Sequence, residues 1–263
     1  MKLTSHRQRL LTGASLTVLL AALIFWATAL VQAAAVILLS VVALVELWNM
    51  FWSGKTGLKT LGAVLAVPVV VFPGMGIKAG GILLASFWVL GAVYTFGARK
   101  ISETALTDVA ILFLGLAYIP FSLQLLLSMS TGELVYVLAA VFASDTAAFY
   151  GGSKWGKRTL CPGISPKKTW MGALCSLGIC VCISLFVGLI WGGAMWAAWL
   201  VAGVCINFGA QVGDLFESAL KRELGVKDSG GLLPGHGGVL DRIDSLLLAG
   251  PVYMAFQWMY PLF

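Results

Sequence analysis

The chain has 263 residues, of which 60% are hydrophobic and only 11% are charged, whereas a soluble domain carries about 25% charged residues. Its mean hydropathy is +0.96, which excludes a soluble globule, a disordered chain, a collagen-like chain and a coiled coil. The net charge of +6 fits basic loops on the cytoplasmic side of a membrane, so no nucleic-acid partner is expected. The composition predicts an all-α polytopic integral membrane protein.

Apolar stretches of about 20 residues, the length that crosses a bilayer, predict about nine transmembrane helices. The third is the least regular, because Pro68 and Pro73 interrupt it. In chain order the expected spans cover 10–28, 31–52, 60–77, 79–97, 109–129, 132–150, 171–192, 194–213 and 243–262.

Basic side chains indicate the sidedness of these spans. Of the 17 Lys and Arg residues, all but Lys78 fall on one side of a nine-span arrangement. The positive-inside rule places that side in the cytoplasm. We therefore expect a multi-pass protein of the cell (inner) membrane with a cytoplasmic N-terminus and a site on the cytoplasmic face.

Charge is concentrated in the second half of the chain. Residues 169–213 carry no charge and are long enough to cross the membrane and return, so the polar loops 145–170 and 214–244 emerge on the same face. We expect an N-terminal transmembrane region, 1–144, with about five to six helices. Residues 145–263 would form the catalytic transmembrane region, with the two loops as its site.

The second polar segment combines carboxylates, fixed positive charges and glycines. Carboxylate oxygens suit a hard cation such as Mg²⁺, basic side chains hold anions, and glycines let backbone amides approach a phosphate closely. The pattern indicates phosphate chemistry at the membrane surface. The charged members are Asp214, Lys221, Arg222, Lys227, Asp228, Asp241, Arg242 and Asp244.

The spacing of these residues resembles the signature of the phosphatidate cytidylyltransferase (CDP-diacylglycerol synthase) family. The matching elements are Ser218-x-Leu220-Lys221-Arg222, Lys227-Asp228, Pro234-x-His236-Gly237-Gly238 and Asp241-Arg242-Ile243-Asp244. Upstream, the run from Asp145 to Gly152, Gly156-Lys157 and Ile164-Ser165-Pro166-Lys167-Lys168-Thr169 resemble the same family's other motif. Phe149, Ser153 and Met171 depart from the residues common there, Tyr, Arg and Glu or Gln.

The resemblance implies the reaction CTP + phosphatidate → CDP-diacylglycerol + pyrophosphate, a step of phospholipid biosynthesis. It implies Mg²⁺ on Asp214 and Asp241, with Asp145, Asp228 and Asp244 as further candidate ligands or their neighbours. A monovalent cation such as K⁺ and a homodimer are open alternatives. The expected anion-binding and catalytic residues are Lys221, Arg222, Lys227, His236 and Arg242, and the expected substrate-binding residues are Asp145, Lys157, Ser165, Lys167, Lys168, Ser218, Gly237 and Gly238.

Other interpretations stay open at this point. Asp145 could cap a helix, Lys167 and Lys168 could be headgroup anchors, and His236 could be a turn residue. Glu46 lies inside the second expected span, where an ionisable side chain is costly, and either a structural pairing or a role in the site would explain it. The rival functions are a CTP-dependent kinase of a polyprenol-type lipid, a secondary transporter and an inactive membrane scaffold.

Overall fold

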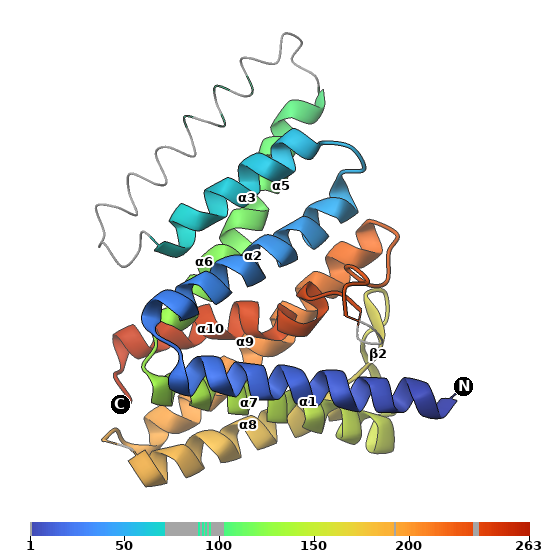
Figure 1. The fold of residues 1–263 in the computed structure, drawn as a ribbon. Coiled ribbons are helices and arrows are strands. Elements are labelled where there is room, and N and C mark those ends of the chain that lie inside the picture. Colours follow the sequence, from blue (N-terminus) through green and yellow to red (C-terminus); the bar gives the residue numbers. More distant parts are fainter. Residues whose placement is uncertain are drawn as a thin grey trace. The chain divides into compact units, whose positions relative to one another are not determined.

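The computed structural model describes residues 2–71, 103–191, 193–233 and 237–263, together with residues 89, 91, 93 and 95. Helices dominate this part of the chain, as the sequence predicts, and a small hairpin is added to them (Figure 1). The helices are α1 (Lys2–Trp26), α2 (Ala29–Phe51), α3 (Thr56–Val71), α5 (Glu103–Tyr118), α6 (Pro120–Leu127), α7 (Thr131–Trp155), α8 (Trp170–Trp191), α9 (Trp196–Glu223) and α10 (Leu240–Met259). Strands β1 (Thr159–Cys161) and β2 (Ser165–Thr169) pair antiparallel.

Within the described part of the chain, five helical stretches are long and apolar enough to cross a bilayer, which agrees with an all-α membrane protein. They are Ala29–Phe51, Thr104–Leu127, Thr131–Trp155, Trp170–Trp191 and Trp196–Glu223, and shorter apolar helices cover Gly13–Trp26 and Thr56–Val71. Most of the expected span 79–97 and the end of the span 60–77 lie outside the described residues. The count of nine spans stays a prediction.

The expected span 109–129 begins earlier than predicted and is interrupted at Ile119, where α5 gives way to α6. Pro120 is the first residue of α6, a position that tolerates proline because the backbone N–H there has no helical partner. The Ile119 N–H still donates to the carbonyl of Gly115 at 3.0 Å. The interruption therefore affects only the helix geometry around Ile119. Thr104–Leu127 remains a single apolar stretch that is long enough to cross the membrane.

The chain divides into two compact units. The first unit comprises Met1–Ser128 and Asp228–Leu240, and the second comprises Met129–Lys227 and Asp241–Phe263. The expected boundary at residue 144 separates the N-terminal region from the catalytic region and does not describe packing. It stays a prediction.

The first unit packs α2, α3, α5 and α6 around Trp48. This side chain is fully buried, its ring stacks on Trp52 with the centroids 6.0 Å apart, and its indole N–H donates to the carbonyl of Ile111 at 3.4 Å. Gly115 permits the contact, since a Cβ atom there would lie 2.8 Å from Trp48 Nε1. One large aromatic side chain therefore fixes how α2 meets α5.

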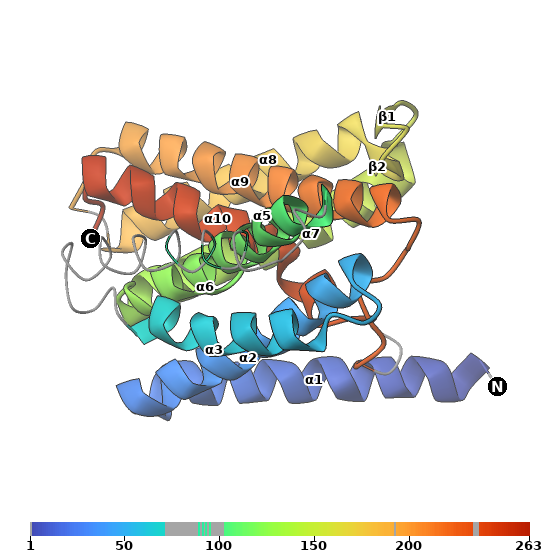
Figure 2. The same ribbon diagram turned by 90° about the horizontal axis from the view of Figure 1, so that it is seen from above.

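The second unit packs α7, α8, α9 and α10 together. Tyr136, Trp199 and Tyr253 are buried in it, and the Tyr136 hydroxyl is 2.7 Å from Ser184 Oγ. Gly172 lets α8 approach α7, because a Cβ atom there would lie 2.8 Å from the carbonyl oxygen of Ala148. Figure 2 shows α8, α9 and α10 running side by side, with the hairpin at one end.

Candidate functional site

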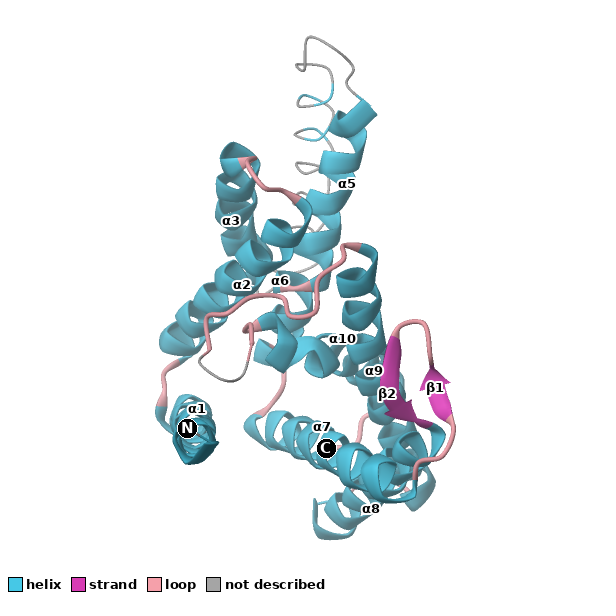
Figure 3. Cartoon of the chain, turned by 90° about the vertical axis from the view of Figure 1, so that its right-hand side faces the viewer, coloured by secondary structure: helices cyan, strands magenta, loops and turns pink. Residues whose placement is uncertain are grey.

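Alternating helix directions bring the charged ends of the second unit together. The C-terminal halves of α7 and α9 meet the start of α10 there, and β2 leads directly into α8 (Figure 3). The expected loops are partly helical, because residues 145–155, 214–223 and 240–244 lie in helices. A helix holds side chains more rigidly than a loop does, so the spacing of the motifs fixes which side chains share a face.

Five carboxylates gather at this end of the second unit. Asp145 comes from α7, Asp214 and Glu217 from α9, and Asp241 and Asp244 from α10. Asp145 interacts electrostatically with Asp214 and Asp244 and accepts a hydrogen bond from the side chain of Ser245. Glu217 interacts with Asp241 and Asp244. We call these five residues the acidic cluster.

Glycine at position 213 lets the two main contributing helices approach each other. A Cβ atom on Gly213 would lie 2.5 Å from the backbone oxygen of Asp244, and one on Gly209 would lie 2.8 Å from the Cα of Ala249. Because Gly213 directly precedes Asp214, a point of close approach between α9 and α10 lies beside their carboxylates.

Two lysines balance part of this negative charge. Lys168 Nζ, at the end of β2, lies 2.6 Å from Asp214 Oδ2. Lys221 Nζ lies 2.7 Å from Asp241 Oδ1 and 3.2 Å from Glu217 Oε1. The first of these pairs joins the two polar segments that the sequence predicts to meet.

The donor set fits a hard divalent cation. The acidic cluster holds more carboxylates than the two paired lysines can neutralise, and crowded carboxylates repel one another unless a cation or proton lies among them. Among the described residues no three His, Cys, Asp or Glu side chains form a ready-made metal cage. Mg²⁺ commonly uses only one or two carboxylates and completes its shell with water and substrate phosphates, so Asp214 and Asp241 suit it.

Some of the other residues expected in the site contact the acidic cluster or the hairpin, and the rest are exposed. Ser218 Oγ donates to Asp214 Oδ1 at 3.4 Å, and Arg222 Nε donates to the carbonyl of Ile164 at 3.2 Å, which ties α9 to the hairpin. Ser165 opens β2 and faces Cys161. The exposed members of the expected set are Lys157, Lys167, Lys227, Asp228 and Arg242.

The glycine-rich part of the motif belongs to the first unit. Gly238 is buried, and a Cβ atom there would lie 2.6 Å from Glu46 Oε2. Gly237 has a φ of +82°, a backbone conformation that glycine adopts at no steric cost. His236 lies outside the described residues, with Pro234 and Gly235.

Glu217 is a functional candidate that the sequence reasoning missed. Its side chain is fully buried, and burying a polar group is costly unless it finds a partner; here its Oε1 lies 3.2 Å from Lys221 Nζ. The signal was present in the sequence, because a glutamate four residues before a lysine on a helix places the two side chains together.

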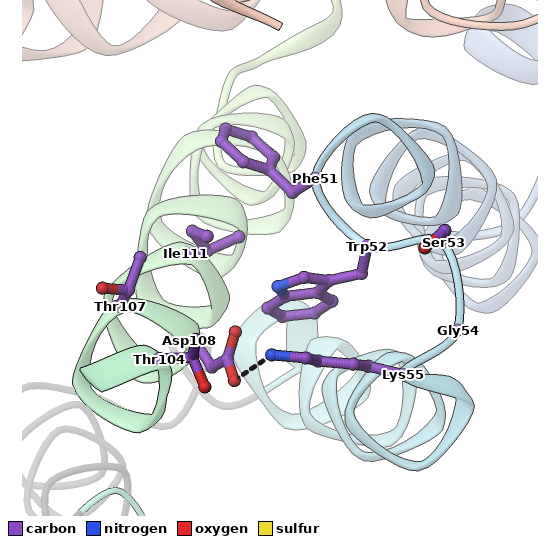
Figure 4. Close-up of a pocket in the computed structure, with 9 residues that line it drawn as sticks. All are labelled: Phe51, Trp52, Ser53, Gly54, Lys55, Thr104, Thr107, Asp108 and Ile111. Carbon is purple, nitrogen blue, oxygen red and sulfur yellow. Dashed lines mark hydrogen bonds and ion pairs between the residues drawn. The ribbon is translucent and has the colours of Figure 1, made fainter. Parts of the chain in front are cut away.

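A separate cavity of about 530 Å³ lies in the first unit, between the end of α2 and the start of α5 (Figure 4). The Lys55 ammonium pairs with the Asp108 carboxylate at its base, and the Trp52 ring lies beside that pair. The residues expected in the site do not line this cavity. The Lys55–Asp108 pair joins the α2–α3 connection to α5, which gives it a structural role.

A helical membrane protein with an acidic, lysine-paired cluster at the helix ends belongs with the membrane enzymes that handle phosphorylated substrates. The sequence profile of the Cytidylyltransferase family matches residues 7–260, and the chain belongs to this family.

Three relatives show the extent of the likeness. A phosphatidate cytidylyltransferase of Staphylococcus epidermidis is 36% identical over 228 residues, which cover 82% of this chain and 85% of the relative. One from Staphylococcus saprophyticus is 32% identical over 224 residues with the same coverage. The chloroplastic phosphatidate cytidylyltransferase 5 of Arabidopsis thaliana is 46% identical over 118 residues, 44% of this chain and 29% of the relative.

Proposed function

We propose that this chain transfers CMP from CTP to phosphatidate, forming CDP-diacylglycerol and pyrophosphate at the cytoplasmic face of the cell membrane. The observation that carries the proposal is the acidic cluster, built from the motif residues of α9 and α10 in a chain of the Cytidylyltransferase family. The names of the relatives supply the substrate, because they are phosphatidate cytidylyltransferases.

The proposed chemistry needs no nucleophile from the protein. A phosphate oxygen of the lipid, already anionic near neutral pH, attacks the α-phosphorus of CTP, and the bond to the β-phosphate oxygen breaks to release pyrophosphate. The barrier lies in bringing two polyanions together, so positioning and electrostatic stabilisation dominate. Exposed cations around the site, Lys157, Lys167, Lys227 and Arg242, would attract both substrates.

Within this proposal, Asp214 and Asp241 hold Mg²⁺, which neutralises phosphate charge when bound. Both carboxylates are paired with lysines, Lys168 and Lys221. Each lysine therefore holds its carboxylate in place while sharing its charge with an arriving phosphate. Asp145 and Asp244, in electrostatic contact with Asp214, would add to the attraction for the cation.

Labelled CTP tests the proposal directly. Purified protein in detergent micelles, supplied with phosphatidate and Mg²⁺, should place label in the lipid product from α-labelled CTP and not from γ-labelled CTP. Omitting Mg²⁺ and adding EDTA should abolish the transfer, and diacylglycerol should not replace phosphatidate. Lipid that carries the γ label, or activity on an alcohol acceptor, would make the chain a lipid kinase and refute the proposal.

A further inference from the structure

A buried carboxylate in the first unit is bound to the segment that leads into α10. Glu46, in α2, has only 7% of its surface exposed. Its Oε1 accepts the backbone N–H of Val239 at 3.0 Å, and its Oε2 accepts the backbone N–H of Leu240 at 2.8 Å. Oε2 also lies 3.2 Å from Ser229 Oγ, which donates to it.

Two motif glycines make this contact possible. A Cβ atom on Gly230 would lie 2.6 Å from Glu46 Oε1, and one on Gly238 would lie 2.6 Å from Glu46 Oε2. A side chain at either position would therefore displace the carboxylate or the backbone that binds it. Glu46 thus holds together both ends of the segment 229–240, which contains the Pro-x-His-Gly-Gly element.

The same contact fixes where α10 begins. The first N–H groups of a helix have no partner within the helix, and a neighbouring side chain such as Ser, Thr or Asp commonly satisfies them. Val239, which precedes the first residue of α10, has no acceptor in its side chain. Glu46, 194 residues before Leu240, supplies the acceptor, and its negative charge is favourable at a helix N-terminus.

Asp241 and Asp244 follow one and four residues after Leu240, on the first turns of α10. Because the helix is continuous from Leu240, its starting point sets the register of both carboxylates. We propose that Glu46 is a positioning residue for nucleotidyl transfer, an inference that rests on the proposed function. It closes the segment 229–240 and caps α10, and so fixes the residue at which the helix that carries Asp241 and Asp244 begins.

The informative variant is Glu46→Gln, because the amide keeps the side-chain volume but replaces one acceptor oxygen with a donor. That NH₂ group would face a backbone N–H of Val239 or Leu240. The matched control is Glu133→Gln. Glu133 is also buried and also caps a helix, accepting the Ser130 N–H at 2.8 Å at the start of α7. It lies twelve residues before Asp145, about 18 Å along the helix.

Two measurements separate positioning from general stability. Hydrogen exchange should accelerate in peptides covering 229–240 in Glu46→Gln and remain as in wild type there in Glu133→Gln. The kcat per folded molecule should fall about tenfold or more in Glu46→Gln, the range seen when supporting contacts around a site are lost. It should stay within about twofold of wild type in Glu133→Gln. Ser229→Ala removes the hydroxyl that donates to Glu46 and should give a smaller loss of kcat. This variant replaces Glu46→Gln in the test if Glu46→Gln fails to fold.

The outcomes distinguish this proposal from the proposed function. If wild-type protein transfers no CMP, the proposed function fails and the positioning role fails with it. If wild type is active and kcat is unchanged in Glu46→Gln, or in Ser229→Ala where Glu46→Gln does not fold, only the positioning role is refuted. An equal fall in kcat in Glu46→Gln and Glu133→Gln would also refute the positioning role, because the loss of kcat would then reflect stability alone.

Discussion

Lys221 is the residue on which the charge balance of the acidic cluster depends most. The sequence suggests that it binds phosphate, and the structure shows its ammonium between Asp241 and Glu217. Glu217 is fully buried, so its carboxylate has no solvent to replace the lysine. At the scale of single residues, the motif lysine stabilises the site before any substrate arrives.

We predict that Lys221→Met destabilises the protein strongly, because it leaves the Asp241 carboxylate, 2.7 Å from the Lys221 ammonium, without its paired cation. Breaking a buried ion pair by removing one partner costs about 3–5 kcal/mol. Thermal unfolding in detergent micelles should show the loss, and adding Asp241→Asn to the same chain should restore part of it. The exposed Lys154 of α7 provides the control. If Lys221→Met unfolds at the same temperature as Lys154→Met, the pairing contributes nothing.

The residues that depart from the family pattern are exposed and belong neither to the acidic cluster nor to its lysine pairs. Phe149 and Met171 are exposed on α7 and α8, and Ser153 is exposed near the end of α7. The carboxylates and lysines of the cluster are all present in the chain. The departures therefore alter the surface beside the site and leave its charge arrangement in place.

At the scale of elements, the approach of α9 to α10 decides whether the carboxylates meet. A methyl group at position 213 would collide with the backbone oxygen of Asp244, which cannot rotate away as a side chain can. We predict that Gly213→Ala separates the two helices locally. The expected costs are about 1–3 kcal/mol of stability and a larger loss of CMP transfer, because Asp214 and Asp244 lie at the contact.

Gly178→Ala in α8 is the matched control for this substitution. A Cβ atom at Gly178 meets nothing within 4 Å, and alanine favours the helix by up to about 1 kcal/mol over glycine. This variant should retain wild-type activity and at least wild-type stability. Full activity in Gly213→Ala, measured in the same assay, would show that the close approach is not required.

At the scale of the whole molecule, the proposed topology places both polar segments in the cytoplasm. Lys157 and Lys227 are exposed, so cysteines at these positions are accessible to a reagent. In a cysteine-free background, Lys157→Cys and Lys227→Cys should react with a membrane-impermeant maleimide only after the cells are opened. Lys78→Cys, expected on the opposite side, should react in intact cells. Labelling of the first two in intact cells would overturn the nine-span arrangement.

The sequence by itself determined the class of protein and the family to which it belongs. Composition and apolar run lengths indicated a helical membrane protein, because the bilayer imposes length and polarity on every span. The motifs over residues 218–244 resemble the family signature, which indicated the family and the charged residues expected in its site. These features are local in the chain, and local patterns can be read without the fold.

The tertiary structure decided which of these residues are partners. It paired Lys168 with Asp214 and Lys221 with Asp241, and it brought Glu46 to the start of α10. It also extended helices into both expected loops. Contacts between distant residues depend on how closely two segments approach each other. Here single glycines such as Gly213 and Gly238 permit the close approach. Periodicity along one helix carries no information about that distance, so these pairings required the packed chain.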